Sequence, residues 1–247
     1  MHSFSESKVN KIISRNQCNE WMQYNQTHMS RVYPGGIRLD SSNYNPVSAW
    51  STGCQLVALN FQTCDAALRA NDGRFRENGN CGYVLKPEEL LNKDFTLNNT
   101  FDAPVLRLII RVLSGSCLPK PRGDRKGECI DPYVQVTLND LTETNEMKIK
   151  TYYTTSINSN GFFPIWNSEE FRFSVLNQSV AILQFTVWDK DVGSKDDFIA
   201  SSSIPISCLR KGYRSVRLYD KSNTRSGAFD FASLLVEVKM EQTLQEV

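Results

Sequence analysis

The chain has 247 residues, with 28 Lys and Arg against 27 Asp and Glu, a formal net charge of +1. Proteins that bind nucleic acid through its phosphates need a clear basic surplus, so this balance excludes a general nucleic-acid binder. Hydrophobic residues make up 40% and charged residues 22% of the sequence, as in ordinary globular proteins, and the length leaves room for two domains.

The N-terminal third combines helical and strand patterns. Ser3 and Glu6 have the spacing of a capping box, and apolar residues then recur at helical intervals, which predicts a helix over about residues 5–22. Three later segments have the composition of short strands: residues 30–33, 55–61 and 82–87. The second is an almost continuous apolar run, typical of a strand buried on both faces of a parallel sheet. Helices that alternate with such strands predict an α/β fold.

The sequence changes character after residue 91. A polar, asparagine-rich stretch over residues 92–103 has no periodic apolar pattern and is predicted to be a linker. From Val105 onwards, short segments of alternating apolar and polar residues follow one another, separated by Gly, Pro, Asn and Asp. This pattern predicts an all-β sandwich of about eight antiparallel strands.

Targeting signals and cysteine motifs are not recognisable in this sequence. Residues 1–6 lack the basic and then apolar layout of a secretory signal. The strongest apolar stretch, residues 105–113, is short and contains two arginines, whereas a membrane-spanning helix needs about 20 apolar residues. The seven cysteines are scattered, and only His2 and His28 could complete a zinc site. These features predict reduced thiols and a cytoplasmic protein that is at most peripheral to membranes.

Several N-terminal motifs together resemble the Y half of eukaryotic phosphoinositide-specific phospholipases C. They are Ser-Arg-Val-Tyr-Pro at 30–34, Asp-Ser-Ser-Asn-Tyr-Asn-Pro at 40–46, Trp50, and the segments 53–63 and 78–87. The resemblance implies an α/β half of a TIM-like barrel followed by a C2 domain. It places the half barrel at 1–91, the linker at 92–103, the C2 domain at 104–242 and a tail at 243–247. Because the sequence stops soon after the last predicted strand, it is most similar to the delta type.

The resemblance also implies a reaction. The family cleaves phosphatidylinositol 4,5-bisphosphate in two stages. The inositol 2-hydroxyl attacks the phosphodiester to release diacylglycerol, and water then opens the cyclic phosphate to give inositol trisphosphate. This chemistry needs a general base, a general acid and a stabiliser of negative charge. The family keeps two histidines and a calcium ion for these roles in its X half, N-terminal to the Y half. Neither His2 nor His28 matches a catalytic position, so we predict no catalytic residue in this chain and no activity of the chain alone.

Headgroup recognition is the role that the resemblance gives to the Y half, through Ser3, Arg31 and Tyr33. A guanidinium at a strand end can hold a phosphate through paired, charge-assisted hydrogen bonds. Tyr33 offers a flat ring and a hydroxyl donor. Ser3 also fits the pattern of a helix N-cap, so both roles stay open for it. Ile37 stands where the family often has a tryptophan in an apolar ridge that enters lipid. Asp40, Asn43 and Tyr44 are interpreted as structural residues of a tight connection.

Acidic residues gather in two loops of the predicted sandwich. The resemblance to C2 domains implies that these loops meet at one end and bind calcium, through the following residues: Asp124, Ile130, Asp131, Asp189, Asp191 and Asp197. Calcium prefers six to eight oxygen ligands, and Asp-x-Asp spacing puts two carboxylates on one side of an extended segment. Without a cation such carboxylates repel one another. Nearby basic residues are predicted to contact anionic lipid once calcium neutralises the tip: Arg122, Arg125, Lys126 and Lys195.

Two hypotheses follow for the function. In the first, the chain is the C-terminal portion of a phosphoinositide phospholipase C, with calcium as its cofactor. Its partners are then the phosphoinositide substrate, an anionic membrane surface and an X half supplied upstream or by a separate chain. In the second, the chain is a non-catalytic module that binds phospholipid in a calcium-dependent way.

Overall fold

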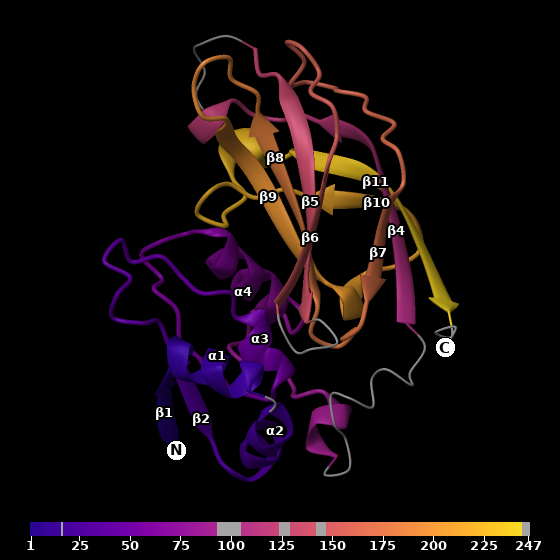
Figure 1. Cartoon of the computed structure of the whole chain (residues 1–247). Helices are drawn as coiled ribbons and strands as arrows, with labels where there is room; N and C mark the ends of the chain where they lie inside the picture. The colour runs from indigo at the N-terminus through magenta and orange to yellow at the C-terminus, as the bar shows by residue number, and fades with distance from the viewer. Residues whose placement is uncertain (16, 93–104, 124–128, 142–146, 244–247) are drawn as a thin grey trace.

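A computed structural model describes residues 1–15, 17–92, 105–123, 129–141 and 147–243, and Figure 1 shows their arrangement. An N-terminal unit of helices around a small sheet lies below a larger β-sandwich formed by the rest of the chain. The predicted linker lies outside the described residues except for Asn92, which follows a short 3-10 helix, η1 (Glu88–Leu91).

The N-terminal unit is built on a three-stranded parallel sheet with the order β1-β2-β3. Its strands are β1 (His2–Ser5), β2 (Ser30–Tyr33) and β3 (Leu56–Val57). Its helices are α1 (Glu6–Ser14), α2 (Cys18–Thr27), α3 (Val47–Ser51) and α4 (Ala66–Arg76). Parallel strands joined by helices confirm the α/β prediction for this part of the chain.

The first helix differs from its prediction in two ways. Ser3 lies in β1, where it pairs with Arg31 of β2, so the N-cap prediction for Ser3 is wrong. The N-cap is Ser5, whose hydroxyl accepts from the backbone N–H of Lys8 at 3.4 Å. The single helix predicted over residues 5–22 is two helices, α1 and α2. The parallel pairing of residues 2–5 with β2 decides where α1 begins, and a local spacing rule cannot include it.

Two strand predictions in this unit are also corrected. Only Leu56 and Val57 of the segment 55–61 form a strand, and Leu56 is exposed rather than buried on both faces. The segment 82–87 forms no strand, and its Tyr83 and Leu85 are exposed. Among the described residues β3 pairs only with β2, so the segment 82–87 does not add a further strand to the sheet. Apolar composition predicts a strand correctly only where a neighbouring strand completes the hydrogen bonds.

The β-sandwich consists of two four-stranded antiparallel sheets in its described part. One has the order β10-β11-β4-β7, from β4 (Val105–Ser116), β7 (Phe171–Val175), β10 (Gly212–Arg217) and β11 (Ser233–Thr243). The other has the order β6-β5-β8-β9, from β5 (Pro132–Leu141), β6 (Met147–Tyr153), β8 (Ile182–Asp189) and β9 (Asp197–Pro205). Strict alternation is plain in β7, where Phe171, Phe173 and Val175 are buried and the residues between them are exposed. Short 3-10 helices complete the unit: η3 (Pro121–Gly123), η4 (Ile206–Cys208) and η5 (Gly227–Phe229).

The two units are packed directly against each other. Helix α4 lies on the outer face of the β6-β5-β8-β9 sheet, and the backbone of Gly73 comes so close to Ser203 that an added Cβ would lie 2.5 Å from it. Gln184 donates to the carbonyl of Ala66 at 2.9 Å, and Asn45 donates to Asn139 at 2.8 Å. One hydrophobic cluster joins both units, with Val47 on one side and Leu141, Val180 and Ile182 on the other. The units therefore share a core rather than a loose hinge.

Candidate functional site

Three side chains predicted to bind a headgroup come together at β1 and β2. Ser3 and Arg31 are register partners, and Tyr33 is two residues beyond Arg31. Residues two apart on a strand point to the same face of a sheet, so Arg31 and Tyr33 project together, beside Ser3. The guanidinium carbon of Arg31 lies 5.4 Å from the centre of the Tyr33 ring, a cation–π distance. Val32 between them is buried against the helices.

Arg31 also lines a hollow of ≈ 570 Å³ on the open side of the parallel sheet. The other walls come largely from residues 53–58 and 82–87, with Arg74 and Phe75 of α4. The exposed apolar side chains of this region, including Leu85, lie where β3 has no further neighbour in the described part of the chain. The Arg31 guanidinium is therefore accessible from a concave surface rather than buried in a core.

The segment after β2 is fixed by an ion pair. The Oε1 atom of Glu6 accepts from the Gly35 backbone N–H at 2.7 Å and from Arg38 Nε at 2.7 Å, while Oε2 accepts from Arg38 Nη2 at 2.8 Å. The hydrogen bond from Arg38 is the main reason that the pKa of Glu6 is lowered, and the same contact raises the pKa of Arg38. On either side of Arg38, the predicted ridge residue Ile37 and its neighbour Leu39 are 91% and 94% exposed.

Two of the residues interpreted as structural, Asn43 and Tyr44, lie in the connection between β2 and α4. The Asn43 amide donates to the carbonyls of Asn60 at 3.2 Å and Thr63 at 3.1 Å. Asp65 caps α4 by accepting from the Leu68 N–H at 3.0 Å, and it also accepts from the backbone of Asn43 at 2.8 Å. The Tyr44 side chain is buried, and its hydroxyl has no partner among the described residues. This network holds the connection between β2 and α4.

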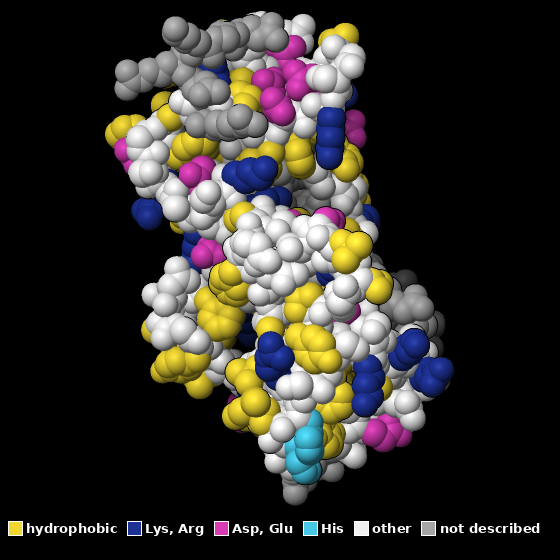
Figure 2. Space-filling model, turned by 90° about the vertical axis from the view of Figure 1, so that its left-hand side faces the viewer, with side chains coloured by type: hydrophobic (Ala, Val, Ile, Leu, Met, Phe, Trp, Pro, Cys, Tyr) yellow, Lys and Arg dark blue, Asp and Glu magenta, His cyan; other side chains and the backbone are white. Residues whose placement is uncertain are grey.

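The acidic loops of the sandwich meet at one end, as expected. Asp189, at the end of β8, accepts from the backbone N–H of Asp131 at 2.7 Å and is the register partner of Asp197. Asp131 accepts from the Ser159 N–H at 2.6 Å. Burial is the main cause of the raised pKa of Asp189, and the nearby charges of Asp191, Asp131 and Asp197 add to it. Figure 2 shows acidic side chains gathered at the upper end of the sandwich.

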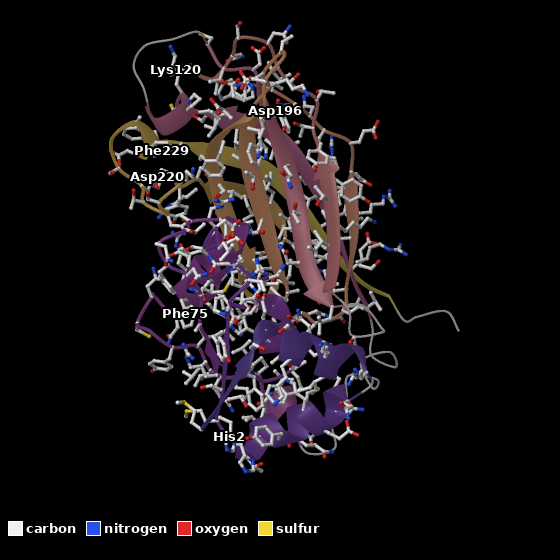
Figure 3. All side chains as sticks on the ribbon, turned by 60° about the vertical axis from the view of Figure 1, so that its left-hand side comes forward. His2, Phe75, Lys120, Asp196, Asp220 and Phe229 are labelled. Atoms are coloured by element: carbon white, nitrogen blue, oxygen red, sulfur yellow. The ribbon has the colours of Figure 1, made fainter. Side chains whose placement is uncertain are left out.

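Asp196 belongs to this acidic end, although the sequence did not single it out as a ligand. It accepts from the Tyr133 hydroxyl at 2.7 Å and from the backbone N–H of Asp191 at 3.1 Å, and Figure 3 shows its position. The bond from Tyr133 is the main cause of its lowered pKa. Asp196 is adjacent to Asp197 in sequence, but its binding to Tyr133 spans two strands and has no local signature.

The remaining residues predicted to bind calcium or lipid at this end are either buried, exposed in a loop, or outside the described residues. Ile130 is buried, and its carbonyl accepts from the Asn160 N–H at 3.1 Å. Asp124, Arg125, Lys126 and the side chain of Arg122 lie outside the described residues, while Lys195 is exposed in the loop before β9. Within the ranges that the structure describes, no three His, Cys, Asp or Glu side chains come close enough to hold a metal ion.

Both histidines lie at the opposite end of the parallel sheet from Tyr33. His2 pairs with Ser30 at the start of the strands and contacts the Tyr24 hydroxyl through Nδ1. The His28 ring stacks on Tyr24 with centroids 4.4 Å apart. Figure 3 shows His2 at the end of the molecule far from the acidic loops. That neither histidine is catalytic stays a prediction.

Comparison with known proteins agrees with this arrangement. The model of the phosphatidylinositol-specific phospholipase C Y domain matches residues 1–89, and that of the C2 domain matches residues 106–220. The parallel-sheet unit is therefore a Y domain and the sandwich is a C2 domain. The chain belongs to the phosphoinositide-specific phospholipase C family, and the resemblance stated from its sequence is confirmed.

Particular relatives refine this assignment. The chain is 39% identical to human 1-phosphatidylinositol 4,5-bisphosphate phosphodiesterase delta-1, over 98% of this chain and 31% of that protein. It is also 39% identical to the Caenorhabditis elegans enzyme gamma plc-3, over 97% of this chain and 17% of that protein. The crystal structure of L. pealei PLC21 superposes with a TM-score of 0.82 at 32% identity, over 99% of this chain and 30% of that chain. The chain thus spans less than a third of these relatives. None of the helices in the described ranges has the length and apolar character needed to span a membrane.

Proposed function

We propose that this chain is the headgroup-binding and membrane-docking portion of a phosphoinositide phospholipase C. The complete enzyme hydrolyses phosphatidylinositol 4,5-bisphosphate to diacylglycerol and inositol trisphosphate, the substrate that the names of the relatives state. The observation that carries the proposal is the placement of Arg31 and Tyr33 on one face of β2, beside Ser3. Arg31 binds a ring phosphate through its guanidinium, while Tyr33 and Ser3 contact the inositol.

The proton-transfer groups of the reaction come from an X half of the barrel. The support for this is the position of His2 and His28, at the far end of the sheet from Tyr33. A sheet whose β1 and β3 each have one neighbour in the described part of the chain also leaves edges that further strands can pair with. In the assembled enzyme, the Y half holds the substrate while the X half moves protons and stabilises charge at phosphorus.

A titration with soluble inositol 1,4,5-trisphosphate tests headgroup binding. We expect calorimetry to detect binding to the full chain, and Arg31→Ala to weaken it by about tenfold or more, because a charge-assisted phosphate contact is lost. Arg217→Ala, which removes an exposed arginine from β10, is the control and should bind as the unchanged chain does. Equal affinity of the Arg31→Ala variant and the unchanged chain would contradict the proposal.

The C2 domain docks the protein on anionic membranes through calcium. The supporting observation is the mutual repulsion around Asp189, whose pKa is raised by burial and then by Asp191, Asp131 and Asp197. Carboxylate oxygens are the ligands that calcium prefers, and a bound cation would relieve the repulsion between them. Because no three of the described acidic side chains are close enough to hold the ion as they stand, binding requires them to move together. The exposed Lys195, and the fully exposed apolar side chain of Val192 in the same loop, then face the lipid surface.

Vesicle sedimentation tests this part of the proposal. Binding to phosphatidylserine vesicles should require calcium and disappear when a chelator is added. The Asp189→Asn, Asp191→Asn double variant should lose the calcium-dependent fraction, because two ligand charges are removed. An Asp220→Asn variant, altered in a turn after β10, serves as a control that should still sediment with the vesicles. Calcium-independent sedimentation of the unchanged chain would exclude the mechanism.

The second candidate function is a non-catalytic, calcium-dependent phospholipid-binding module. The observation in its favour is again that both histidines lie at the end of the parallel sheet opposite Tyr33. Both candidates predict vesicle binding, so only an X half distinguishes them. Phosphodiesterase activity that appears when an X half is added favours the enzyme, and binding without any such activity favours the module.

A further inference from the structure

We propose that Glu6 and Arg38 are positioning residues for headgroup binding, because their ion pair holds the ends of β1 and β2 in the alignment that brings Ser3, Arg31 and Tyr33 together. This inference rests on the proposed function of that face. Neither residue touches the proposed ligand; both act through the strands that carry the three contacting side chains.

The location of the pair is the first argument. Ser5 and Tyr33 are the last register partners of β1 and β2. Glu6 is the residue after Ser5, and its carboxylate binds Gly35 and Arg38, which follow Tyr33 by two and five residues. The side chain therefore continues the connection between the two strands where their backbone pairing ends.

The number and direction of the bonds are the second argument. Two nitrogens of Arg38 bind the two oxygens of Glu6 in a bidentate arrangement, and the Gly35 N–H adds a third donor. A bidentate arginine–carboxylate pair fixes orientation as well as distance, which a single contact cannot do. Glu6 is only 7% exposed. A carboxylate at that depth is costly unless its donors stay in place, so the pair resists opening.

The shape of the backbone at Gly35 is the third argument. A Cβ atom at this position would lie 2.9 Å from Oε1 of Glu6, closer than carbon and oxygen normally approach. The turn can therefore come close enough to donate its N–H to the carboxylate because it has a glycine there. The close approach and the ion pair together fix the path of the chain directly after Tyr33.

The other end of the segment is held as well. Arg38 donates from Nη1 to the Ser42 hydroxyl at 3.0 Å, and the neighbouring Asn43 is bound to Asp65 at the start of α4. Between these anchors, Ile37 and Leu39 project outwards on either side of Arg38. The Glu6–Arg38 ion pair thus fixes the positions of both the headgroup side chains and the exposed apolar side chains next to them.

The experiment compares ion-pair variants by calorimetry with soluble inositol 1,4,5-trisphosphate, using the full chain. Glu6→Gln keeps the size of the side chain and removes its charge, and we expect binding to weaken by about tenfold, because misaligned contacts lose most of their strength. The matched control is Glu77→Gln. It removes another ion pair of the N-terminal unit, in which Glu77 Oε2 lies 2.8 Å from Arg74 Nη1. Both variants should lose thermal stability, but only Glu6→Gln should lose affinity.

Conservative variants separate positioning from general stability. Arg38→Lys keeps the charge without the bidentate geometry, so its affinity should lie between those of the unchanged chain and Glu6→Gln. If Glu6→Gln does not fold, as judged by circular dichroism, Arg38→Lys decides: a folded variant with unchanged affinity overturns the inference. An Arg31→Ala variant without any loss of affinity overturns the proposed function, and with it this inference. Loss of affinity in Arg31→Ala together with unchanged affinity in Glu6→Gln overturns the inference alone.

Discussion

At the scale of single residues, the carboxylate of Glu6 shows how a buried charge can organise its surroundings. Its three donors come from a segment about thirty positions away in the chain and compensate for the loss of water. Tyr44 is a contrasting case, because its hydroxyl is buried without a partner among the described residues. An unpaired buried hydroxyl costs stability, so Tyr44 carries a local energetic disadvantage.

The lowered pKa of Glu6 predicts how stability changes with pH. A carboxylate whose folded pKa lies below its ordinary value of 4.5 stabilises the fold above that value. The contribution is lost as the pH falls through the lower, folded pKa. The stability difference between the unchanged chain and Glu6→Gln should therefore be constant at neutral pH and shrink below about pH 4.5. Urea unfolding of both proteins across this range measures it, and a difference that does not change with pH would contradict the prediction.

The family resemblance named the candidate residues of both sites, and spacing added only which side chains share a face. Arg31 and Tyr33 are two apart in a strand, and that spacing alone puts them on one face. Asp189 was expected at the tip from the resemblance to C2 domains, and it accepts from the backbone of Asp131 in the other loop, while calcium binding stays a prediction. Glu6 was interpreted only as part of a capping box, because its partner Arg38 lies in another segment and no local pattern connects them. Long-range ion pairs depend on the fold and cannot be derived from spacing.

At the scale of elements, α4 packs so closely against β9 that it leaves no room for a side chain at Gly73. Its Gly73 faces Ser203 of β9, and a Cβ atom there would lie 2.5 Å from the Ser203 side chain and carbonyl. Distances this short cannot be accommodated by rotating a side chain, because one of the atoms is backbone. The helix and the sheet approach each other as closely as glycine allows.

A methyl group at Gly73 should therefore separate α4 from the sheet. We expect Gly73→Ala to destabilise the protein by about 1–3 kcal/mol, the usual range for overpacking a well-packed contact. Gly36→Ala is the control, since a Cβ atom at Gly36 meets nothing within 4 Å. Denaturant unfolding of the two variants provides the comparison, and equal midpoints would show that α4 and β9 can move apart without cost.

The elements of the sandwich were easier to predict than those of the Y domain. In β7 one face is buried and the other exposed, so alternation identifies the strand. In β8, Gln184 is buried too, because the Y domain covers that part of the sheet's outer face. The segments 55–61 and 82–87 of the Y domain have the composition of strands, but only two of their residues pair. Pairing depends on neighbours that composition does not reveal.

At the scale of the whole molecule, the proposed function requires an X half in addition to the parallel sheet of the described residues. We expect this chain alone to release no inositol trisphosphate from vesicles containing phosphatidylinositol 4,5-bisphosphate. Addition of the X half of the human delta-1 relative should produce release, because in the proposed function the acid and base come from an X half. Radiolabelled substrate measures the product, and the X half alone is the control. Turnover by this chain without an X half would contradict the assignment of roles.

The shared core between the Y and C2 domains has a consequence for membranes of different shape. Because α4 and the β6-β5-β8-β9 sheet are in close contact, we expect the proposed headgroup face and the proposed calcium loops to keep one angle to each other. A protein whose two membrane-contacting faces keep a fixed angle fits one membrane curvature better than others. Lipid vesicles of small radius and flat bilayers of the same composition should therefore differ in how readily both faces engage at once. We therefore expect membrane binding by this protein to depend on curvature.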